Sequence, residues 1–475
     1  MKAVEETINR SERCFDRLQR TLLCDGCIPR KGLSVQVIEG FLIRLASLDS
    51  NNRFGGISVG AGEREGRVIS SLVEKLHYGF AHGIGRSGNL TEGQPKAVGS
   101  TILSTIANNL ALDAIKFLGI PSTKAAMVVP VATGMSLSVC LGSWRHYKPH
   151  AKFVVFLRID QKSCLKSIFT AGYEPIIIDS VPGTETSDSL TTDLINLRTV
   201  LEKQNHEIIA VLSATSGFAP REPDNLIAVG ELCKRYGVKH LVNNAYGLQS
   251  PECRKRIEEA GSSGYIDAFV QSTDKNFLVP VGGSVVATFS KKALDNIANF
   301  YPGRASMVPS RDLLITLLQI GKTGLKHLYE VQQNNFEILS TAMQDYAESI
   351  GQKVLEAKSN RISIAVTLQG WPKNDQSAFG ARLFSRGITG ARVIQKGLIK
   401  KIDGYEFASF GSHSSLGNYD YINVACAIGM TTEEIDQLIM VLKSETPKWA
   451  FTSLKNIDNG NLSIIQYDLA KKLIF

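Results

Sequence analysis

The spacing of hydrophobic positions changes along the chain near residues 120 and 305. Before about residue 120, apolar residues recur every three to four positions, as in "SVQVIEGFLIRLASLD" and "GSTILSTIANNLALDAIKFLGI". This spacing places apolar side chains on one face of a helix. The pattern therefore predicts a largely helical N-terminal region over residues 1–120.

Between residues 121 and 305 the apolar residues gather in short, β-branched runs. Helical stretches such as "TTDLINLRTVLEKQN" separate most of these runs. Because strands that alternate with helices are covered on both faces, the pattern predicts a large α/β domain with a seven-stranded, mostly parallel sheet. A short link between the last two strands allows one antiparallel neighbour. The seven runs are "AAMVVPVATG", "KFVVFLRID", "EPIIIDSV", "EIIAVLSATSG", "KHLVNNAYG", "DAFVQSTD" and "GGSVVATFS".

Residues 306–475 predict a smaller C-terminal α/β domain. A helical pattern covers roughly residues 310–350. Three further strand-like runs follow it, "RISIAVTL", "GARVI" and "YINVACAIGM", and residues 446–475 carry no informative pattern.

The composition is that of a globular enzyme rather than a membrane protein. Hydrophobic residues make up 43% of the chain and charged residues 21%. No apolar run approaches the roughly 20 residues that cross a bilayer. The charged and acidic start, "MKAVEETINRSERCFDRLQR", is unlike a targeting peptide. We therefore expect a cytoplasmic protein with no membrane partner.

Two local patterns of cysteine and arginine leave little or ambiguous signal. Cys24 and Cys27 form a C-x-x-C, but no second pair or histidine at finger spacing accompanies them, so free thiols are expected. The net charge of +8 includes arginines that would share one helix face. That face is either solvated or a strip that follows nucleic-acid phosphates, and both readings stay open. These arginines are Arg10, Arg13, Arg17 and Arg20.

The stretch "GIGRSG" matches the spacing of a dinucleotide-binding loop without its context. Such a loop needs a preceding strand and an acidic residue about 20 positions later. Here the helical stretch "SSLVEKLHYGFAH" precedes it, and position 108 is Asn. What remains is a flexible loop with Arg86 and Ser87, followed by Gln94, whose groups suit an anion.

Three predicted strands end in residues that suit a phosphorylated, ring-containing ligand. "VATGMS" places Thr133 and Gly134 at a strand-to-helix turn, which is either a phosphate seat or an ordinary N-cap. "LVNNAYG" places Asn243 and Ala245 after another strand, where an amide can bond a ring nitrogen and a small residue can lie under a ring. Ligands of open α/β sheets bind at this edge.

Lys275 follows the sixth predicted strand in "DAFVQSTDKNFLVPVGGSVVA". A lysine buried beside such strands must be neutralised, paired or used covalently, whereas a surface lysine in a turn needs no explanation. The order of a phosphate seat, a ring partner and a lysine resembles that of fold-type I pyridoxal-phosphate enzymes. In that group of enzymes the lysine binds the cofactor covalently.

A more specific resemblance rests on ten stretches in family order between about residues 10 and 445. The chain resembles the O-phosphoseryl-tRNA(Sec):selenium transferase family in these stretches. They are "LDSNN", "GEREGRV", "HGIGRSG", "QPKA", "VATGMSL", "RIDQKSC", "VNNAYG", "DAFVQSTDKNF", "YPGRAS" and "GARV". The resemblance implies a fold-type I transferase that converts O-phosphoseryl-tRNA(Sec) to selenocysteinyl-tRNA(Sec) with selenophosphate and pyridoxal 5'-phosphate.

The resemblance also implies roles for individual residues. Lys275 would bind the cofactor covalently and act as the catalytic base, and Asn243 would face the ring nitrogen of the cofactor. Arg64 would reach the cofactor phosphate from a neighbouring subunit. The other expected cofactor contacts are Thr133, Gly134, Met135, Gln161 and Ala245. The residues expected to hold the phosphate of the phosphoseryl substrate are Arg86, Ser87, Gln94 and Arg304.

For partners, the resemblance implies tRNA(Sec) and a homotetramer, with no DNA. Arg386 of "FSRGITG" matches a tRNA-contacting arginine of the family, and the N-terminal region would serve oligomerisation and tRNA contact. A second family arginine that meets tRNA, before "IDAFV", is Ser262 here, which puts the details of tRNA contact in doubt.

The residue at the ring nitrogen bears on the reaction type. A carboxylate at the ring nitrogen keeps that nitrogen protonated and stabilises a carbanion at Cα, and a neutral Asn243 does so less well. A less stable carbanion suits a reaction in which a good β leaving group such as phosphate is lost early. The expected reaction is therefore β-elimination of phosphate followed by β-addition of selenium. Two alternatives are a cysteine desulfurase or selenocysteine lyase, which needs an activated cysteine, and a tRNA-binding scaffold with a dead site.

Overall fold

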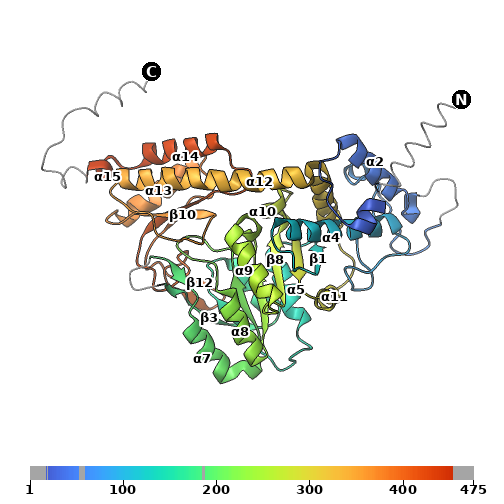
Figure 1. Cartoon of the computed structure of the whole chain (residues 1–475), viewed down its shortest axis with the longest axis horizontal. Coiled ribbons are helices and arrows are strands. Elements are labelled where there is room, and N and C mark those ends of the chain that lie inside the picture. The colour runs from blue at the N-terminus through green and yellow to red at the C-terminus, as the bar shows by residue number, and fades with distance from the viewer. Residues whose placement is uncertain (1–17, 19, 53–58, 184–187, 453–475) are drawn as a thin grey trace, which may run out of the picture.

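A seven-stranded sheet forms the centre of the computed structural model, which describes residues 18, 20–52, 59–183 and 188–452 (Figure 1). The strand order is β1-β9-β8-β7-β6-β2-β3. Six strands run in the same direction, and β9 is antiparallel to both of its neighbours, β1 and β8. The predicted strands and the antiparallel neighbour are therefore confirmed. The bounds are β1 Ala125–Val129, β2 Phe153–Leu157, β3 Glu174–Ile178, β6 Ile208–Ala214, β7 Lys239–Asn243, β8 Ala268–Ser272 and β9 Ser284–Thr288.

Helices cover both faces of this sheet, which explains why most residues of its strands are apolar. Along β2, Val155 packs in a cluster with α7 and α8, whereas Val154 and Phe156 pack in the cluster that includes α5 and α6. Successive strand residues point to opposite faces, so both faces need apolar side chains. The helices around the sheet are α5 Thr133–Ser143, α6 Lys162–Thr170, α7 Leu194–Gln204, α8 Leu226–Tyr236, α9 Pro251–Ser262, α10 Thr273–Phe277 and α11 Lys291–Ala298.

The N-terminal helices share the hydrophobic core of the sheet. Both predicted helices are present, α2 at Val35–Ala46 and α4 at Val98–Leu118. α4 packs on β1 and on α12, and Leu103 and Leu110 belong to the same apolar cluster as β1. The described residues between α2 and α4 hold only short helices, η2 Ser50–Asn52 and α3 Ser71–Leu76, and η1 Thr21–Asp25 precedes α2. The boundary at residue 120 stays a prediction.

The predicted long helix is α12, Val308–Ser349, which runs from the N-terminal helices to the C-terminal ones (Figure 1). It is broken at Gly321, whose φ of 63° and ψ of 178° are not helical. The segment at residues 29–33 crosses the break and is bonded there, with Lys322 N donating to Pro29 O at 2.8 Å and Leu33 N to Leu318 O at 2.9 Å. The N-terminal segment is thereby anchored to α12.

The C-terminal region has its own small core. A three-stranded antiparallel sheet in order β10-β14-β11 packs with α13, α14 and the second half of α12. The β12–β13 hairpin differs, because Ile402 and Phe407 belong to the core of the large sheet. The bounds are β10 Ser363–Thr367, α13 Lys373–Ser385, β11 Arg392–Ile394, β12 Lys400–Ile402, β13 Tyr405–Phe407, β14 Tyr421–Ala425, α14 Thr432–Glu445 and α15 Lys448–Thr452, with β4 Val181–Pro182 and β5 Leu190–Thr191 as a small hairpin beside the large sheet.

Other sequence expectations have mixed outcomes. Helix α3, and no strand, precedes "GIGRSG" in the described chain, so the dinucleotide reading fails as predicted. Cys24 and Cys27 are exposed free thiols. Of the arginine strip, Arg10, Arg13 and Arg17 lie outside the described residues. Within the described ranges, no helix is both long and apolar enough to span a bilayer.

The break in α12 gives a stability prediction. An added Cβ at Gly321 would lie 2.6 Å from Gly32 N and Lys31 C, and backbone atoms cannot rotate away. We expect Gly321→Ala to cost about 3 kcal/mol of unfolding free energy, from the strained φ and the clash together. Gly237→Ala is the matched control, because Gly237 has φ of 62° but nothing within 4 Å of the added Cβ.

Gly237→Ala should therefore cost only about 1 kcal/mol. Urea unfolding followed by circular dichroism measures both variants. Equal destabilisation of the two would show that the crossing segment does not constrain Gly321.

Candidate active site

A cavity of about 520 Å³ lies at the carboxyl edge of the parallel strands, where Lys275 is located. Its lining residues follow β2, β6, β7 and β8 or come from the C-terminal region. Parallel strands bring the residues that follow them to one edge, which is where open α/β sheets bind ligands. The lining is Gln161, Ser163, Phe218, Tyr246, Gln249, Asp274, Lys275, Leu278, Ile362, Arg392, Ala425, Ala427 and Ile428.

Lys275 lies in the one-turn helix α10 directly after β8, and its side chain is exposed to this cavity. Of the two positions that the sequence left open for Lys275, buried or exposed, the structure has the exposed one, because β8 ends at Ser272 and β9 begins only at Ser284. Within the described chain the Lys275 ammonium has no hydrogen-bond or ion-pair partner. Exposure at the carboxyl edge leaves this amine free to react with a ligand in the cavity.

Gln249 fixes the position of α10. Its Nε2 donates to Lys275 O at 2.7 Å, and its Oε1 accepts from Ile428 N at 2.9 Å. Tyr329 of α12 donates from its hydroxyl to Asn276 O at 3.0 Å. The backbone around Lys275 is thus held from β7, α12 and the C-terminal region. Sequence reasoning missed Gln249, whose only signal was a glutamine shortly after "VNNAYG".

The predicted cofactor residues Thr133, Gly134 and Met135 begin α5. Thr133 is the first helical residue rather than the N-cap, which is Ala132, and its buried Oγ1 has no partner in the described structure. A Cβ at Gly134 would lie 3.2 Å from Ser163, so glycine permits close approach to a residue that lines the cavity. Met135 is exposed. An unpaired hydroxyl at the positive end of a helix suits an anion.

Asn243, Ala245 and Gln161 are connected through Cys164. Asn243 is fully buried at the end of β7, where its Nδ2 donates to Cys164 Sγ at 2.9 Å and its Oδ1 accepts from Ala245 N at 3.1 Å. Cys164 in turn donates to Gln161 Oε1 at 3.5 Å. Of these residues only Gln161 lines the cavity, and the others lie behind its wall.

The predicted phosphate-binding residues form a second group. Arg86 and Ser87 lie in a turn closed by two backbone hydrogen bonds between Arg86 and Asn89, of 2.8 and 2.9 Å. Ile84 pairs with Ala305 in both directions, which places this turn beside Arg304. Arg304 is half-buried and lines a cavity of about 360 Å³, and its Nε and Nη2 are buried without a partner in the described chain.

Arg304 lies near a second cation, Arg64, and near the carboxylate of Asp49. Burial and then the nearby charge of Arg64 lower the pKa of Arg304. Arg64 is exposed and only loosely paired with Glu63, at 3.9 Å. Gln94 follows Arg86 and Ser87 closely in the sequence, and its backbone N donates to Thr101 Oγ1 at 3.0 Å. None of the residues of this group lines the Lys275 cavity.

The predicted tRNA contact is separate again. Arg386 ends α13 and borders a third cavity, of about 440 Å³. Its guanidinium is exposed and donates from Nε to Glu445 Oε1 at 2.8 Å. Ser262, which replaces the family arginine, is exposed at the end of α9.

Arg392 and Phe218 line the Lys275 cavity and were not assigned from the sequence, although "GARV" contains Arg392. The Arg392 guanidinium lies over the Phe218 ring, 4.4 Å from its centroid. His413 also stacks on the Phe218 ring, with ring centroids 6.4 Å apart and an interplanar angle of 16°.

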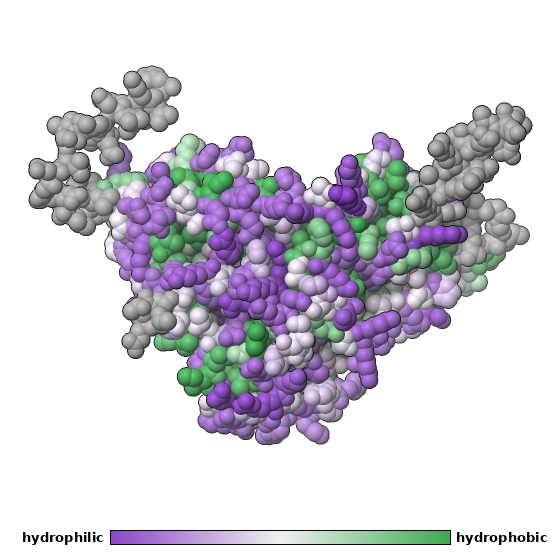
Figure 2. Space-filling model, viewed as in Figure 1, coloured by the Kyte–Doolittle hydropathy of each residue, from purple (hydrophilic) through white to green (hydrophobic). Residues whose placement is uncertain are grey.

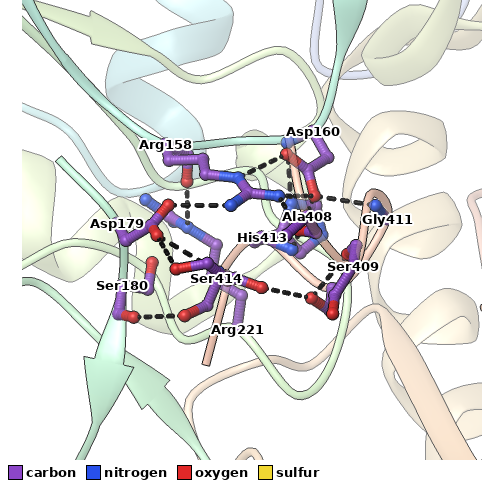
Figure 3. A network of polar contacts seen from close by, with 12 residues as sticks. Arg158, Asp160, Asp179, Ser180, Arg221, Ala408, Ser409, Gly411, His413 and Ser414 are labelled. Atoms are coloured by element: carbon purple, nitrogen blue, oxygen red, sulfur yellow. Dashed lines mark hydrogen bonds and ion pairs between the residues drawn. The ribbon is translucent and has the colours of Figure 1, made fainter. Parts of the chain in front are cut away.

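A buried charge network holds His413 (Figure 3). Arg158 donates to both carboxylate oxygens of Asp160, at 2.8 and 3.1 Å, and to Ala408 O at 2.8 Å. The Asp160 backbone N donates to His413 Nδ1 at 2.9 Å, so in the neutral ring the proton is on Nε2. Burial lowers the pKa of His413 to about 3, which keeps this ring neutral. The C-terminal loop is thereby attached to the edge of the large sheet.

Two other cysteines bear on the desulfurase alternative. Cys164 lies in α6 behind the cavity wall, and burial raises the pKa of its thiol to about 12. Burial also raises the pKa of Cys426 to about 11. A thiol reacts as a nucleophile in its thiolate form, so neither cysteine is activated.

Comparisons with known proteins agree with one another. A family model described as O-phosphoseryl-tRNA(Sec) selenium transferase, SepSecS, matches residues 48–446. The protein of that name from Caenorhabditis elegans is 47% identical over 437 residues, which cover 92% of this chain and 90% of that protein. The one from Dictyostelium discoideum is 41% identical over 450 residues, covering 90% and 93%.

Solved structures give the same family and the wider fold. A crystal structure of archaeal O-phosphoseryl-tRNA(Sec) selenium transferase has a TM-score of 0.83 and 28% identity, and covers 94% of this chain and 98% of that chain. The glutamate decarboxylase domain of a Vibrio parahaemolyticus protein has a TM-score of 0.53 at 12% identity, with coverage of 75% and 74%, which shows the fold alone. The fold is that of the fold-type I pyridoxal-phosphate enzymes.

The state of Cys164 gives a prediction. Because its thiol is buried and its pKa is raised to about 12, almost none of it is thiolate at about pH 8. Iodoacetamide added to the folded protein should alkylate the exposed Cys24 readily and leave Cys164 unmodified, as measured by peptide mass spectrometry. Alkylation of Cys164 as fast as Cys24 would mean an activated thiol and would favour the desulfurase alternative.

Proposed function

The chain belongs to the O-phosphoseryl-tRNA(Sec) selenium transferase family, and from this premise we propose that it converts O-phosphoseryl-tRNA(Sec) to selenocysteinyl-tRNA(Sec) with selenophosphate. The observation that carries the proposal is the unpaired Lys275 amine, exposed in a cavity at the carboxyl edge of a fold-type I sheet. A scaffold with a dead site would have no use for a free lysine held in place by Gln249.

The site residues fit pyridoxal 5'-phosphate. The unpartnered Thr133 hydroxyl at the N-terminus of α5 suits the cofactor phosphate, together with Gly134 and Met135. Gln161 and Lys275 line the cavity. Asn243 and Ala245 lie behind its wall, on the side proposed to hold the cofactor ring. When bound, this cofactor withdraws electrons from an attached amino acid and makes its Cα–H acidic.

Lys275 serves as the base that accepts the Cα proton of the phosphoseryl group. No partner in the described chain competes for the Lys275 amine. The amine can therefore move toward Cα and away from it while the backbone of α10 stays in place. Asn243 contributes no charge, because a carboxamide is neutral, and its amide is held by hydrogen bonds to Cys164 and Ala245. A neutral group favours prompt loss of the β leaving group over persistence of the carbanion.

The second group of residues binds the departing and the arriving phosphate. Loss of the Cα proton to Lys275 accompanies cleavage of the Cβ–O bond, whose electron pair leaves with phosphate. The selenium of selenophosphate then adds to Cβ while Lys275 returns the proton to Cα, and water cleaves the Se–P bond to release phosphate. Arg304 offers two unpartnered N–H groups for these anions, near a second cation, Arg64. Arg86, Ser87 and Gln94 complete the group.

A second copy of the chain brings the two groups together. The residues proposed to bind the substrate phosphate do not line the Lys275 cavity of their own chain. Exposed apolar residues of α3 and its approach, Ile69, Leu72 and Leu76, lie in the same segment as Arg64 and suit a subunit contact. We therefore propose a composite site in a homotetramer built from such dimers, with no DNA or membrane partner, in the cytoplasm.

The tRNA partner binds over a basic surface. Arg386 is exposed, and its single ion pair with Glu445 is weak enough to be exchanged for a phosphate. The net charge of +8 favours a polyanion generally. We propose three functional divisions: residues 1–120 for oligomerisation and tRNA contact, residues 121–305 for the cofactor, and residues 306–475 as the C-terminal domain.

Replacement of Lys275 tests the central assignment. Because its side chain is exposed and unpaired, Lys275→Ala should change the unfolding free energy by less than about 0.5 kcal/mol. It should lose covalent retention of pyridoxal phosphate, measured as the near-ultraviolet absorbance of the reduced pyridoxyl group after denaturing gel filtration of borohydride-treated protein, and all conversion of phosphoseryl-tRNA. Lys275→Arg keeps the charge and should fail equally. Wild-type turnover by either variant would refute the proposed chemistry.

Mixed assemblies test the composite site. Lys275→Ala and Arg304→Ala homodimers should each be inactive. In a mixed dimer, the intact Lys275 cavity of the Arg304→Ala subunit faces the intact phosphate-binding residues of the Lys275→Ala subunit. We expect roughly half of wild-type activity per purified mixed dimer, measured with two affinity tags. Lys275→Ala mixed with Gln161→Ala is the control, because both residues line one cavity and no intact site can form. Equal inactivity of both mixtures would place Arg304 in the site of its own subunit.

A further inference from the structure

The terminal nucleotide of the tRNA must lie beside the Lys275 cavity. In an aminoacyl-tRNA the amino acid is esterified to the ribose of the 3'-terminal adenosine. Lys275 has to reach Cα of that amino acid, and only the ester bond separates Cα from the ribose. Some of the cavity lining that is free of the assigned cofactor residues must therefore contact this adenosine.

Phe218 and Arg392 form a flat surface in that part of the cavity. The Arg392 guanidinium lies 4.4 Å from the centroid of the Phe218 ring. In the described chain, Arg392 has no carboxylate or other ion-pair partner. The one carboxylate in the cavity lining, Asp274, accepts a hydrogen bond from Ser272. Arg392 is thus an exposed, unpaired cation on an aromatic ring.

The chemistry of the proposed substrate excludes the simplest use of such an arginine. A free amino acid would offer its α-carboxylate to Arg392, but an esterified amino acid has none. A planar guanidinium beside an aromatic ring also stacks on nucleobases. The neighbouring walls, Leu278, Ile362 and Ile428, are apolar and suit the faces of a base.

The Phe218 ring is held rigidly in place. His413 stacks on it, and the Arg158–Asp160 ion pair of the network fixes His413. Tyr246 packs on Phe218 as well, with ring centroids 5.8 Å apart. A fixed Phe218 ring holds the Arg392 guanidinium that lies over it, so the guanidinium loses little conformational freedom when a base stacks on it, which strengthens binding.

The Lys275 cavity adjoins the cavity beside Arg386. The cavity beside Arg386 and the Lys275 cavity share Ala425 and Ala427 as lining residues. The segment from Arg386 to Arg392 runs from one cavity to the other. This segment gives a single-stranded 3' end that enters beside Arg386 a route toward Arg392.

We propose that Phe218 and Arg392 form a stacking platform for the terminal adenine of the aminoacyl-tRNA. This inference rests on the proposed function and names the seat of one part of its substrate. The platform positions the ester so that Cα faces Lys275.

The test compares two uncharged tRNAs, one ending in CCA and one shortened to CC, by fluorescence anisotropy with the full-length protein. Wild type should bind the shortened tRNA roughly tenfold more weakly, the loss of one stacked base. Arg392→Ala and Phe218→Leu should reduce this ratio to below about threefold, and Phe218→Tyr, which keeps a ring, should restore it. A ratio is insensitive to general weakening of tRNA binding.

Arg145→Ala is the matched control, because Arg145 also lies over an aromatic ring, at 5.4 Å from the Tyr173 centroid, but does not line the cavity. It should keep the wild-type ratio. An unchanged ratio in both platform variants, or no loss in wild type, would overturn the inference. Conversion of phosphoseryl-tRNA by wild type, measured in parallel, separates this failure from that of the proposed function.

Discussion

The buried ion pair of Arg158 and Asp160 is the interaction on which the arrangement of the active site depends. Two charges buried this deeply are costly unless hydrogen bonds satisfy them fully. Here Asp160 accepts from Arg158 and also from the backbone N of Gly411 and His413, at 2.7 and 2.8 Å. The carboxylate that follows β2 therefore requires the C-terminal loop for its satisfaction, and the loop cannot leave without exposing a buried charge.

This requirement carries through to the cavity. His413, fixed by Asp160, stacks on Phe218, and Phe218 carries Arg392. Arg221 extends the network, since it donates to Arg158 O at 3.0 Å and to Asp224 at 2.9 Å. One side of the cavity is thus rigid because of electrostatics. The opposite side, α10 with Lys275, is held by neutral hydrogen bonds from Gln249 and Tyr329, which leave the lysine amine unpaired.

The sequence was a good guide wherever a residue acts through its local position. Thr133, Asn243 and Lys275 each follow a strand, so strand order alone placed them at one edge of the sheet. It was a poor guide to burial. The apolar strands that flank Lys275 left open whether it is buried or exposed, and only the structure shows that β8 ends before it, β9 begins after it, and its side chain is exposed in the cavity. Phe218 and Arg392 carried no signal singly, because they are far apart in the chain and meet only in the folded protein.

By itself, the sequence determined the seven strands, the antiparallel β9, the long helix α12 and the position of Thr133, Asn243 and Lys275 at the ends of strands. These features follow from the local period of apolar residues and from the turns that end each strand, both of which are short-range. Only the tertiary structure decided the break at Gly321, the attachment of the C-terminal loop through Asp160, and the separation of Arg304 from the Lys275 cavity. Those features depend on contacts between segments distant in the chain, whose packing and desolvation no local pattern encodes.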